Sequence, residues 1–561
     1  MPSHRQPSRV QFALLALCFL FLIANPLAAE EYGPASPEVL ALSNAYVRGG
    51  ILFPWTSYPV SGMKLRELAD SLASTGIELP SLPLFYPVHG ATEEVSSLSG
   101  YLKYNYTRIS SSQQSLVQPD APRDGIDLQR GWLALPPLAA AGFVASSDTG
   151  LSIEFDGVLR SPRPEGRLSI DNLPGFTTGV GPSIDHHILG RGILSWENPA
   201  FRVWFGRDTM QIGAPDLSTL YPSKLLPYMD AARLQGRAGP VNLDWTVSTF
   251  LPVKNWEGLD VDNAAKPFER NWGGQWWSSS DFNPTTILYV AHRLEFVGDR
   301  LSFALGEQII YARPNNSYEI KNFLPVGTFH ANDTYPDNMN LIFEFGAALL
   351  PGLTLRAMAG FDDLSSDIIG IADSPVPTIP AAILGFEFSG APVKIPLSGI
   401  IEGGYTHYLW GNFDADQNQS GNWYGNGEFL ARMIARYEYD GGGVLLPLTS
   451  PYGPGALWAR GLARVVLPVR DLNLEVRALF LSKNKSTNLV STAYASDPAV
   501  EKATRTVLAE IRVALSYTIA LTGASLALCA EPVVTLLDGK LGTGVCIAGS
   551  LDLSFKDTRR Q

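Results

Sequence analysis

The sequence predicts an all-β protein, a large closed antiparallel transmembrane β-barrel that follows a short N-terminal helical or irregular segment. Three observations predict this fold. From about residue 100 onward, apolar and polar side chains alternate along many short runs, as they do along β-strands. The polar face of several runs carries charge, which hydrocarbon would not solvate. Glycine and proline, with 52 and 41 copies, supply turns between strands.

Residues 1–29 have the pattern of a cleaved secretory signal peptide. A basic start that includes Arg5 and Arg9 is followed by the apolar run 12–24 and by small residues that end at Ala29. This run is too short for a permanent transmembrane helix, and no later stretch reaches the length of about 18 apolar residues that a spanning helix needs. Together with the barrel pattern, the signal predicts export to the outer membrane of a diderm bacterium.

Residues 30–99 are expected to form a small helical or irregular segment on the periplasmic side. Ser61 can cap a helix in which four apolar residues recur at helical spacing: Met63, Leu65, Leu68 and Leu72. The segment is short for a core of its own, so we expect it to lie beside or inside the barrel.

Residues 100–561 are predicted to form the barrel, and the stretch 285–363 shows its pattern most clearly. Turns at 298–300 and 351–352 separate alternating runs. Between 353 and 362, one face is apolar (Leu353, Leu355, Ala357, Ala359, Phe361) and the other carries Thr354, Arg356, Met358, Gly360 and Asp362. At roughly 28–30 residues for each strand with its loop, the chain accommodates about 16–18 strands.

The charges on these faces are expected to line the lumen, because a basic side chain facing lipid at the bilayer midplane costs about 2–4 kcal/mol. One interpretation is a basic channel for an anionic solute or acidic polysaccharide. The other, favoured because both signs are interleaved, is a ladder of cross-strand ion pairs that closes the interior. The predicted lumen charges are Arg356, Arg432, Arg436, Arg460, Arg464, Arg477 and Arg512, with Asp362, Glu438, Glu475 and Glu510.

Two polar loops rich in aromatic residues are candidate carbohydrate-binding sites. Sugar rings stack on indoles while nearby amides and carboxylates hydrogen-bond the hydroxyls. An aromatic girdle at the membrane interface is the alternative reading of the same residues. The candidates are Trp272, Trp276 and Trp277 in the first loop, and Trp410, Trp423 and Tyr424 in the second.

Catalysis, metal binding and cofactor binding find little support in the sequence. Neither G-x-S-x-G nor H-E-x-x-H occurs. The segment 414–418 resembles the start of a calcium loop, but Gln419 stands where that loop needs glycine. We therefore expect no enzyme activity, no metal and no cofactor, and the net charge of −12 argues against a nucleic-acid partner. Cys529 and Cys546 flank a predicted turn, and a disulfide and two buried thiols both remain open.

Several short motifs occur in order between residues 182 and 425, and this order resembles the capsule-assembly (Wzi-like) family of outer-membrane proteins. The family's Trp-Gly-Pro-Gly turn appears here as Ile212-Gly213-Ala214-Pro215, which is a departure from the pattern. The positions that carry the resemblance are Arg207, Gly213, Ser218, Glu307, Tyr311, Asp337, Asn338 and Asp362.

The resemblance implies a non-catalytic barrel that helps to bind or attach surface or capsular polysaccharide. Its implied partners are outer-membrane lipid, the polysaccharide and the barrel-assembly machinery. A porin-like channel for small or anionic solutes is the alternative function, and the two differ in whether the lumen is open.

Overall fold

The computed structural model describes residues 31–77, 97–111, 137–146, 150–159, 169–171, 175–177, 181–183, 189–252, 269–272, 275–278, 286–313, 316–324, 337–362, 378–391, 395–412, 432–439, 442–467, 472–485, 487, 504–521 and 524–555. The predicted signal peptide, the segment 414–418, Trp423 and Tyr424 lie outside the described residues.

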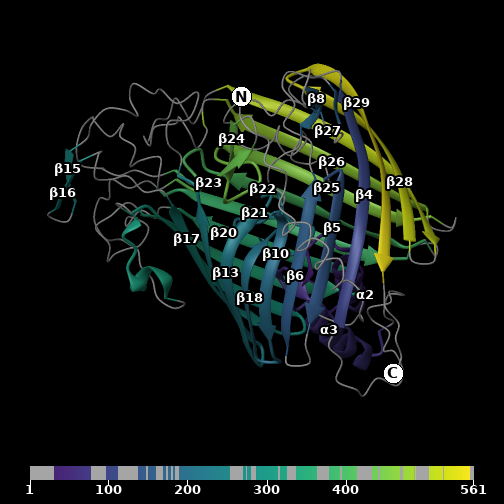
Figure 1. Ribbon diagram of the computed structural model, residues 1–561, viewed down its shortest axis with the longest axis horizontal. Helices are drawn as coiled ribbons and strands as arrows, with labels where there is room; N and C mark the ends of the chain where they lie inside the picture. The colour runs from purple at the N-terminus through teal and green to yellow at the C-terminus, as the bar shows by residue number, and fades with distance from the viewer. Residues whose placement is uncertain are drawn as a thin grey trace, which may run out of the picture.

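The described strands form a closed antiparallel barrel (Figure 1). One sheet contains 19 described strands, of which β7 (Ser169–Asp171) pairs only with the far end of β4. The other 18 close into a ring, because β6 also pairs with β10. The predicted all-β barrel is therefore confirmed, with a strand number inside the expected range. In order, the wall strands are β4 (Ser97–Ser111), β5 (Ala139–Ser146), β6 (Leu151–Leu159), β10 (Leu189–Glu197), β11 (Phe201–Asp208), β13 (Met229–Ala238), β14 (Val241–Phe250), β17 (Ile287–Val297), β18 (Leu301–Tyr311), β19 (Asp337–Leu350), β20 (Leu353–Phe361), β21 (Pro380–Gly390), β22 (Leu397–Thr406), β25 (Ala456–Val466), β26 (Leu472–Asn484), β27 (Arg505–Leu521), β28 (Ala524–Leu537) and β29 (Lys540–Phe555).

The outside of the wall is apolar and the inside is polar, as the alternation predicts. On β18, Leu301, Phe303 and Leu305 are about half exposed, whereas Ser302 between them is buried. Exposed apolar side chains of this kind recur around the ring, for example Ile511 on β27. A continuous apolar belt is unfavourable in water but is what a barrel presents to hydrocarbon.

The two ends of the barrel differ in their connections. At one end, which we call the short-turn end, brief connections such as 198–200, 239–240 and 351–352 join neighbouring strands. At the other, the long-loop end, most connections are long, including 209–228 and 407–455. No helix among the described residues has the length and apolar character to cross a bilayer.

Two helices, α2 (Pro37–Gly49) and α3 (Gly62–Ser74), precede the barrel and lie at its short-turn end (Figure 1). The hydroxyl of Ser61 accepts a hydrogen bond from Lys64 N at 3.1 Å, so the predicted cap of α3 is confirmed. Leu65, Leu68 and Leu72 pack against α2, as their spacing predicts, but Met63 is 39% exposed. Gly352 N donates to Val47 O at 2.7 Å, which ties α2 to a wall turn.

Some short elements stand apart from the wall. β12 (Gln211–Ile212) pairs with β2 (Ser57–Tyr58), and β1 (Glu31–Tyr32) pairs with β3 (Val60–Ser61). The others are the hairpins β8 (Gly175–Thr177) with β9 (Gly181–Ser183), β15 (Glu269–Trp272) with β16 (Gln275–Ser278), and β23 (Ile434–Tyr439) with β24 (Gly442–Pro447), and the 3-10 helix η5 (Ile320–Phe323).

The β23–β24 hairpin corrects one prediction. The alternation from Ala431 to Tyr439 predicts a wall strand with Arg432 and Arg436 towards the lumen, yet β23 pairs only with β24 among the described strands. Its apolar face, including Met433 and Tyr437, packs in the interior against wall residues such as Trp204. A buried hairpin inside a barrel has the same period of two as a wall strand, so the pattern alone does not separate them.

Candidate functional site

Two segments of the chain occupy the lumen, and we call residues 51–61 and 209–228 together the plug. They contact each other through the β2–β12 pairing and a hydrogen bond from Gly213 N to Thr56 O at 2.7 Å. One comes from the helices at the short-turn end, and the other descends from the long-loop end. The plug therefore spans the interior between the two ends.

Inward-facing arginines bind the first plug segment through its backbone carbonyls. Arg233 Nη1 donates to Tyr58 O at 2.6 Å, Arg202 Nη1 to Pro59 O at 3.0 Å, and Arg356 Nη2 to Phe53 O at 3.2 Å. Since the peptide carbonyls of this extended segment have lost water, these charge-assisted hydrogen bonds replace their hydration. This function of the lumen charges is not visible in the sequence.

The most buried ion pair of the plug contact joins Arg233 on β13 to Asp244 on β14. Arg233 is 0% exposed, and its Nε donates to Asp244 Oδ1 at 2.8 Å. The hydroxyl of Ser57 donates to the same carboxylate and accepts from Arg233. Removing either charge would leave the other buried without its counter-ion.

The second plug segment is bound by charges from β22 and β25. Arg464 donates to both oxygens of Asp216, at 2.5 and 3.0 Å, and Arg460 donates to the carbonyl of the same residue. Glu402 accepts from Ser218 N at 2.8 Å and also from its hydroxyl. Ser218, a position of the family resemblance, therefore acts as a plug contact.

Lys224 adds a pH-sensitive charge to this segment. Its Nζ donates to Pro215 O at 2.7 Å and lies 4.0 Å from Asp216 Oδ1. Burial, with Arg460 and Arg464 nearby, lowers the pKa of Lys224 to about 8 against the opposing effect of Asp216. Because this value lies below the ordinary 10.5, the unfolded chain binds more protons between pH 8 and 10.5, and stability rises with pH there.

We therefore predict that raising the pH from about 7 to about 10 stabilises the plug by about 1–3 kcal/mol through Lys224. The Lys224→Met variant should show a flatter dependence. The measurement is the midpoint temperature of the mobility shift on semi-native gels, for both proteins at each pH. An equal pH response of the two proteins would contradict the assignment.

At three glycines of the wall, side chains of the plug pack directly against the backbone of the wall strands. A Cβ added at Gly385 would lie 2.6 Å from Leu217, and one at Gly360 would lie 3.0 Å from Leu220. At Gly306 the added Cβ would overlap the hydroxyl of Tyr221. These three packing positions were not predicted from the sequence, although a glycine inside a strand is a known sign that another part of the chain packs closely against it.

The predicted lumen arginines of the wall face inward and pair across strands. Their partners are Glu387 for Arg356 (3.2 Å), Glu402 for Arg460 (3.0 Å), Glu475 for Arg464 (2.7 Å), and Glu531 for both Arg477 (3.4 Å) and Arg512 (2.9 Å). This is the geometry of the ion-pair ladder rather than of a uniformly basic channel. Arg432, two residues before the β23–β24 hairpin, is buried, and Arg436 on β23 donates through Nη1 to Pro252 O at 2.8 Å.

Several positions of the family resemblance hold loops in place. Asp362 accepts from Gly411 N at 2.7 Å, and Asn338 Nδ2 donates to Asn412 O at 2.8 Å. Arg207 instead pairs across wall strands: it forms two hydrogen bonds to Asp230 on β13, at 2.6 and 2.8 Å. Gly213 has a positive φ of 121°, and the other three positions, Glu307, Tyr311 and Asp337, are buried on β18 and β19.

Among the described residues, three aromatic candidates share one hairpin and Trp410 lies apart from them. Trp410 is 0% exposed and packs with Leu220, Tyr221 and Ile342, so its indole has no open face for a sugar. The other described candidates, Trp272, Trp276 and Trp277, lie on the β15–β16 hairpin, which Figure 1 shows well away from the wall. Trp410 is thus a core residue, because the loop that carries it folds back into the barrel.

Two remaining predictions concern the cysteines and metal binding. Cys529 and Cys546 are free thiols. Within the described parts of the chain, no group of three or more His, Cys, Asp or Glu residues is arranged to hold a metal ion.

Comparisons with known proteins identify the fold. No family model matches the sequence, and no curated protein matches it. The structure is similar over 94% of this chain, and all of the other, to Wzi of Escherichia coli, an outer-membrane protein involved in group 1 capsule assembly and a carbohydrate-binding β-barrel. The TM-score is 0.54 and the sequence identity 13%.

Porins match less well. A BenF-like porin of Pseudomonas fluorescens has a TM-score of 0.40 at 10% identity, with coverage of 82% of this chain and 99% of the porin. OprD of Pseudomonas aeruginosa has a TM-score of 0.38 at 9% identity, covering 82% of this chain and 95% of that one. The chain has the fold of an outer-membrane β-barrel, and at the level of the fold the resemblance found in the sequence is confirmed.

Proposed function

We propose that this protein is a closed outer-membrane barrel that binds or attaches surface or capsular polysaccharide and catalyses no reaction. One observation carries the proposal: the lumen holds two segments of the protein's own chain, bound to the wall through the Arg464–Asp216 ion pair and through hydrogen bonds from buried wall arginines such as Arg233. A porin needs a continuous aqueous path, whereas a binding protein needs only a rigid scaffold for its loops. The fold shared with a carbohydrate-binding barrel supports the second role.

The arrangement of the ends supports an orientation. Outer-membrane barrels have short periplasmic turns and longer external loops. The short-turn end, with α2 and α3, then faces the periplasm after removal of residues 1–29. The long-loop end faces outward and carries Trp272, Trp276 and Trp277, which with Trp423 and Tyr424 remain our candidate carbohydrate contacts. Outer-membrane lipid and the barrel-assembly machinery are the other partners of this proposal.

A porin-like channel for small or anionic solutes is the second candidate function. It is favoured by Arg477, whose side chain points into the lumen from β26 and is 52% exposed. The plug contacts described above argue against it, because they fill the lumen beside Arg477: Asp216 of the plug binds Arg460 and Arg464 on the neighbouring strand β25.

Conductance in planar bilayers separates the two functions. We expect the wild-type protein to show no steady ohmic pore. A variant in which residues 213–227 are replaced by a short glycine linker should conduct, which also controls for correct insertion. A large steady pore in the wild type would contradict the closed barrel.

Retention of polysaccharide at the cell surface tests the other half of the proposal. Deletion of the gene in its native host should reduce the polysaccharide that stays with the cells and increase the fraction released into the medium. Unchanged retention would remove the attachment role.

A further inference from the structure

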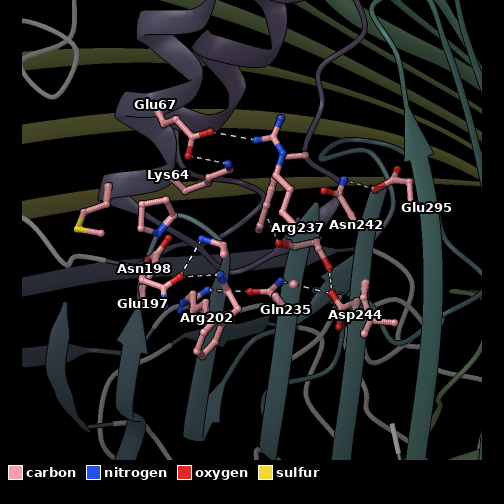
Figure 2. Close-up of a pocket in the computed structure, with 18 of the residues that line it drawn as sticks. Lys64, Glu67, Glu197, Asn198, Arg202, Gln235, Arg237, Asn242, Asp244 and Glu295 are labelled. Atoms are coloured by element: carbon pink, nitrogen blue, oxygen red, sulfur yellow. Dashed lines mark hydrogen bonds and ion pairs between the residues drawn. The ribbon is translucent and has the colours of Figure 1, made fainter. Parts of the chain in front are cut away.

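A cavity of about 440 Å³ lies between α3 and the inner wall at the short-turn end (Figure 2). Residues of α3 and Trp55 form one side, and the ends of β10, β11, β13, β14 and β17 form the other. Its volume falls in the range of about 300–1,000 Å³ that is usual for small-molecule sites. Its floor shares Arg202, Asp244 and Ser57 with the plug contacts described above, whereas its mouth on α3 takes no part in those contacts.

Solvent exposure falls from the mouth of this cavity to its floor. At the mouth, Met63 is 39% exposed, and the side chains of Glu67 and Arg237 are 52% and 32% exposed. At the floor, Arg202 and Asp244 are 3% and 5% exposed. A ligand can therefore enter from the short-turn end and reach polar groups that are already fixed in position.

The charges around the cavity balance. Glu67 bridges Lys64 (2.7 Å) and Arg237 (3.0 Å) at the mouth, and Figure 2 shows all three side chains pointing toward one another. With no excess of either sign, the cavity has no net attraction for an anion or a cation. The five basic residues that line it are Lys64, Arg66, Arg202, Arg237 and Arg293, and the five acidic ones are Glu67, Asp70, Glu197, Asp244 and Glu295.

Besides the charged groups, two side-chain amides and one indole line the cavity. Asn242 Nδ2 donates to Glu295 at 3.2 Å. Gln235 accepts from Arg202 at 3.2 Å and donates through Nε2 to Asp244 at 3.3 Å, which leaves one N–H of its amide group. Each amide has two N–H donors and one carbonyl acceptor, so these bonds leave capacity for a bound hydroxyl. The half-buried ring of Trp55 also lines the cavity, with Lys64 Nζ 5.5 Å from its centroid.

We propose that this cavity binds a short neutral saccharide. Amide groups that hydrogen-bond hydroxyls, an indole that can face a sugar ring, and balanced charges together fit an uncharged, hydroxyl-rich ligand. The ligand class rests on the proposed function, but the site is new, since it lies at the opposite end from the aromatic loops. The barrel then contacts saccharide on its periplasmic side as well.

The test uses the full-length mature protein in a detergent without a sugar headgroup, because maltoside and glucoside detergents carry the ligand class itself. The protein is applied to an array of neutral and acidic oligosaccharides. Met63→Trp fills the cavity from its exposed mouth, and Asn242→Leu removes an amide from its wall. Ala73→Trp is the matched control, because it places the same side chain on an exposed position of α3 outside the cavity.

We expect the wild type and Ala73→Trp to bind neutral oligosaccharides, and each cavity variant to bind them at least tenfold more weakly. Semi-native gels, with unchanged midpoint temperatures, check that the variants fold. If the wild type binds but both cavity variants bind equally well, the cavity assignment is overturned and the proposed function stands. If the wild type binds no glycan, the proposed function itself fails. A preference for acidic glycans that the cavity variants abolish would overturn the neutral ligand.

Discussion

Replacing Arg233 with methionine is expected to release residues 51–61 from the lumen. The substitution leaves Asp244 buried without its counter-ion and removes the donors to Tyr58 O and Ser57. Breaking a buried pair in this way costs about 3–5 kcal/mol. We expect a lower midpoint temperature on semi-native gels, faster proteolysis between α2 and α3, and the appearance of conductance in bilayers.

Arg207→Met is the matched control for this variant. Arg207 lies on the neighbouring strand β11 and also makes two hydrogen bonds to an aspartate, but the side chain of that partner, Asp230, is 46% exposed. The Arg207 guanidinium lies over the ring of Tyr228, in the other plug segment, so the control tests the hold on residues 51–61. An exposed pair contributes about 0–1 kcal/mol. Equal effects of the two substitutions would show that Arg233 does not hold the plug.

Leucine at Gly306 or Gly360 is expected to expel the loop 209–228 from the lumen. Each glycine faces inward. A Cβ at Gly306 would meet Tyr221 of the loop, and one at Gly360 would meet Trp410 at 2.7 Å as well as Leu220 of the loop at 3.0 Å. Overpacking usually costs about 1–3 kcal/mol, and a backbone strand of the wall cannot move aside, so the loop must move. The expected result is a conducting barrel with a normal wall.

Gly461→Leu controls for the effect of leucine in a wall strand. Gly461 alternates with inward-facing Arg460 on β25, so its new side chain would face lipid, and the nearest atom to an added Cβ is 4.0 Å away. This variant should remain closed to ions. If both Gly306→Leu and Gly360→Leu keep a closed lumen, then the loop 209–228 does not pack against these two glycines.

The wall of the barrel was predictable from the sequence because lipid and lumen impose opposite demands on neighbouring residues. Arg356, Arg460 and Arg464 alternate with apolar residues, and all three point inward, where they bind the plug. The helix that begins after Ser61 was predictable for a similar local reason, since its cap and its apolar spacing lie within four turns.

The plug was not predictable in the same way, because its contacts join distant parts of the chain. Ser218 and Glu402 are 184 residues apart, and Tyr58 and Arg233 are 175 apart. The errors at Arg432, Arg436 and Trp410 share one cause. All three lie in the connection 407–455, which returns to the interior. An alternating run reads the same in a wall strand as in a hairpin inside the barrel, and an aromatic residue in a polar loop reads the same whether its ring is exposed or buried.

The pairing of β2 with β12 has a mechanical consequence. It ties a strand fixed at the short-turn end to a loop anchored at the long-loop end, so that the cylinder contains an internal brace. Tension applied to the outer loops, for example by a tethered polymer, would pass down this brace to α2 and α3 as well as along the wall. In the orientation that we propose, a load on the cell exterior would thus reach α2 and α3.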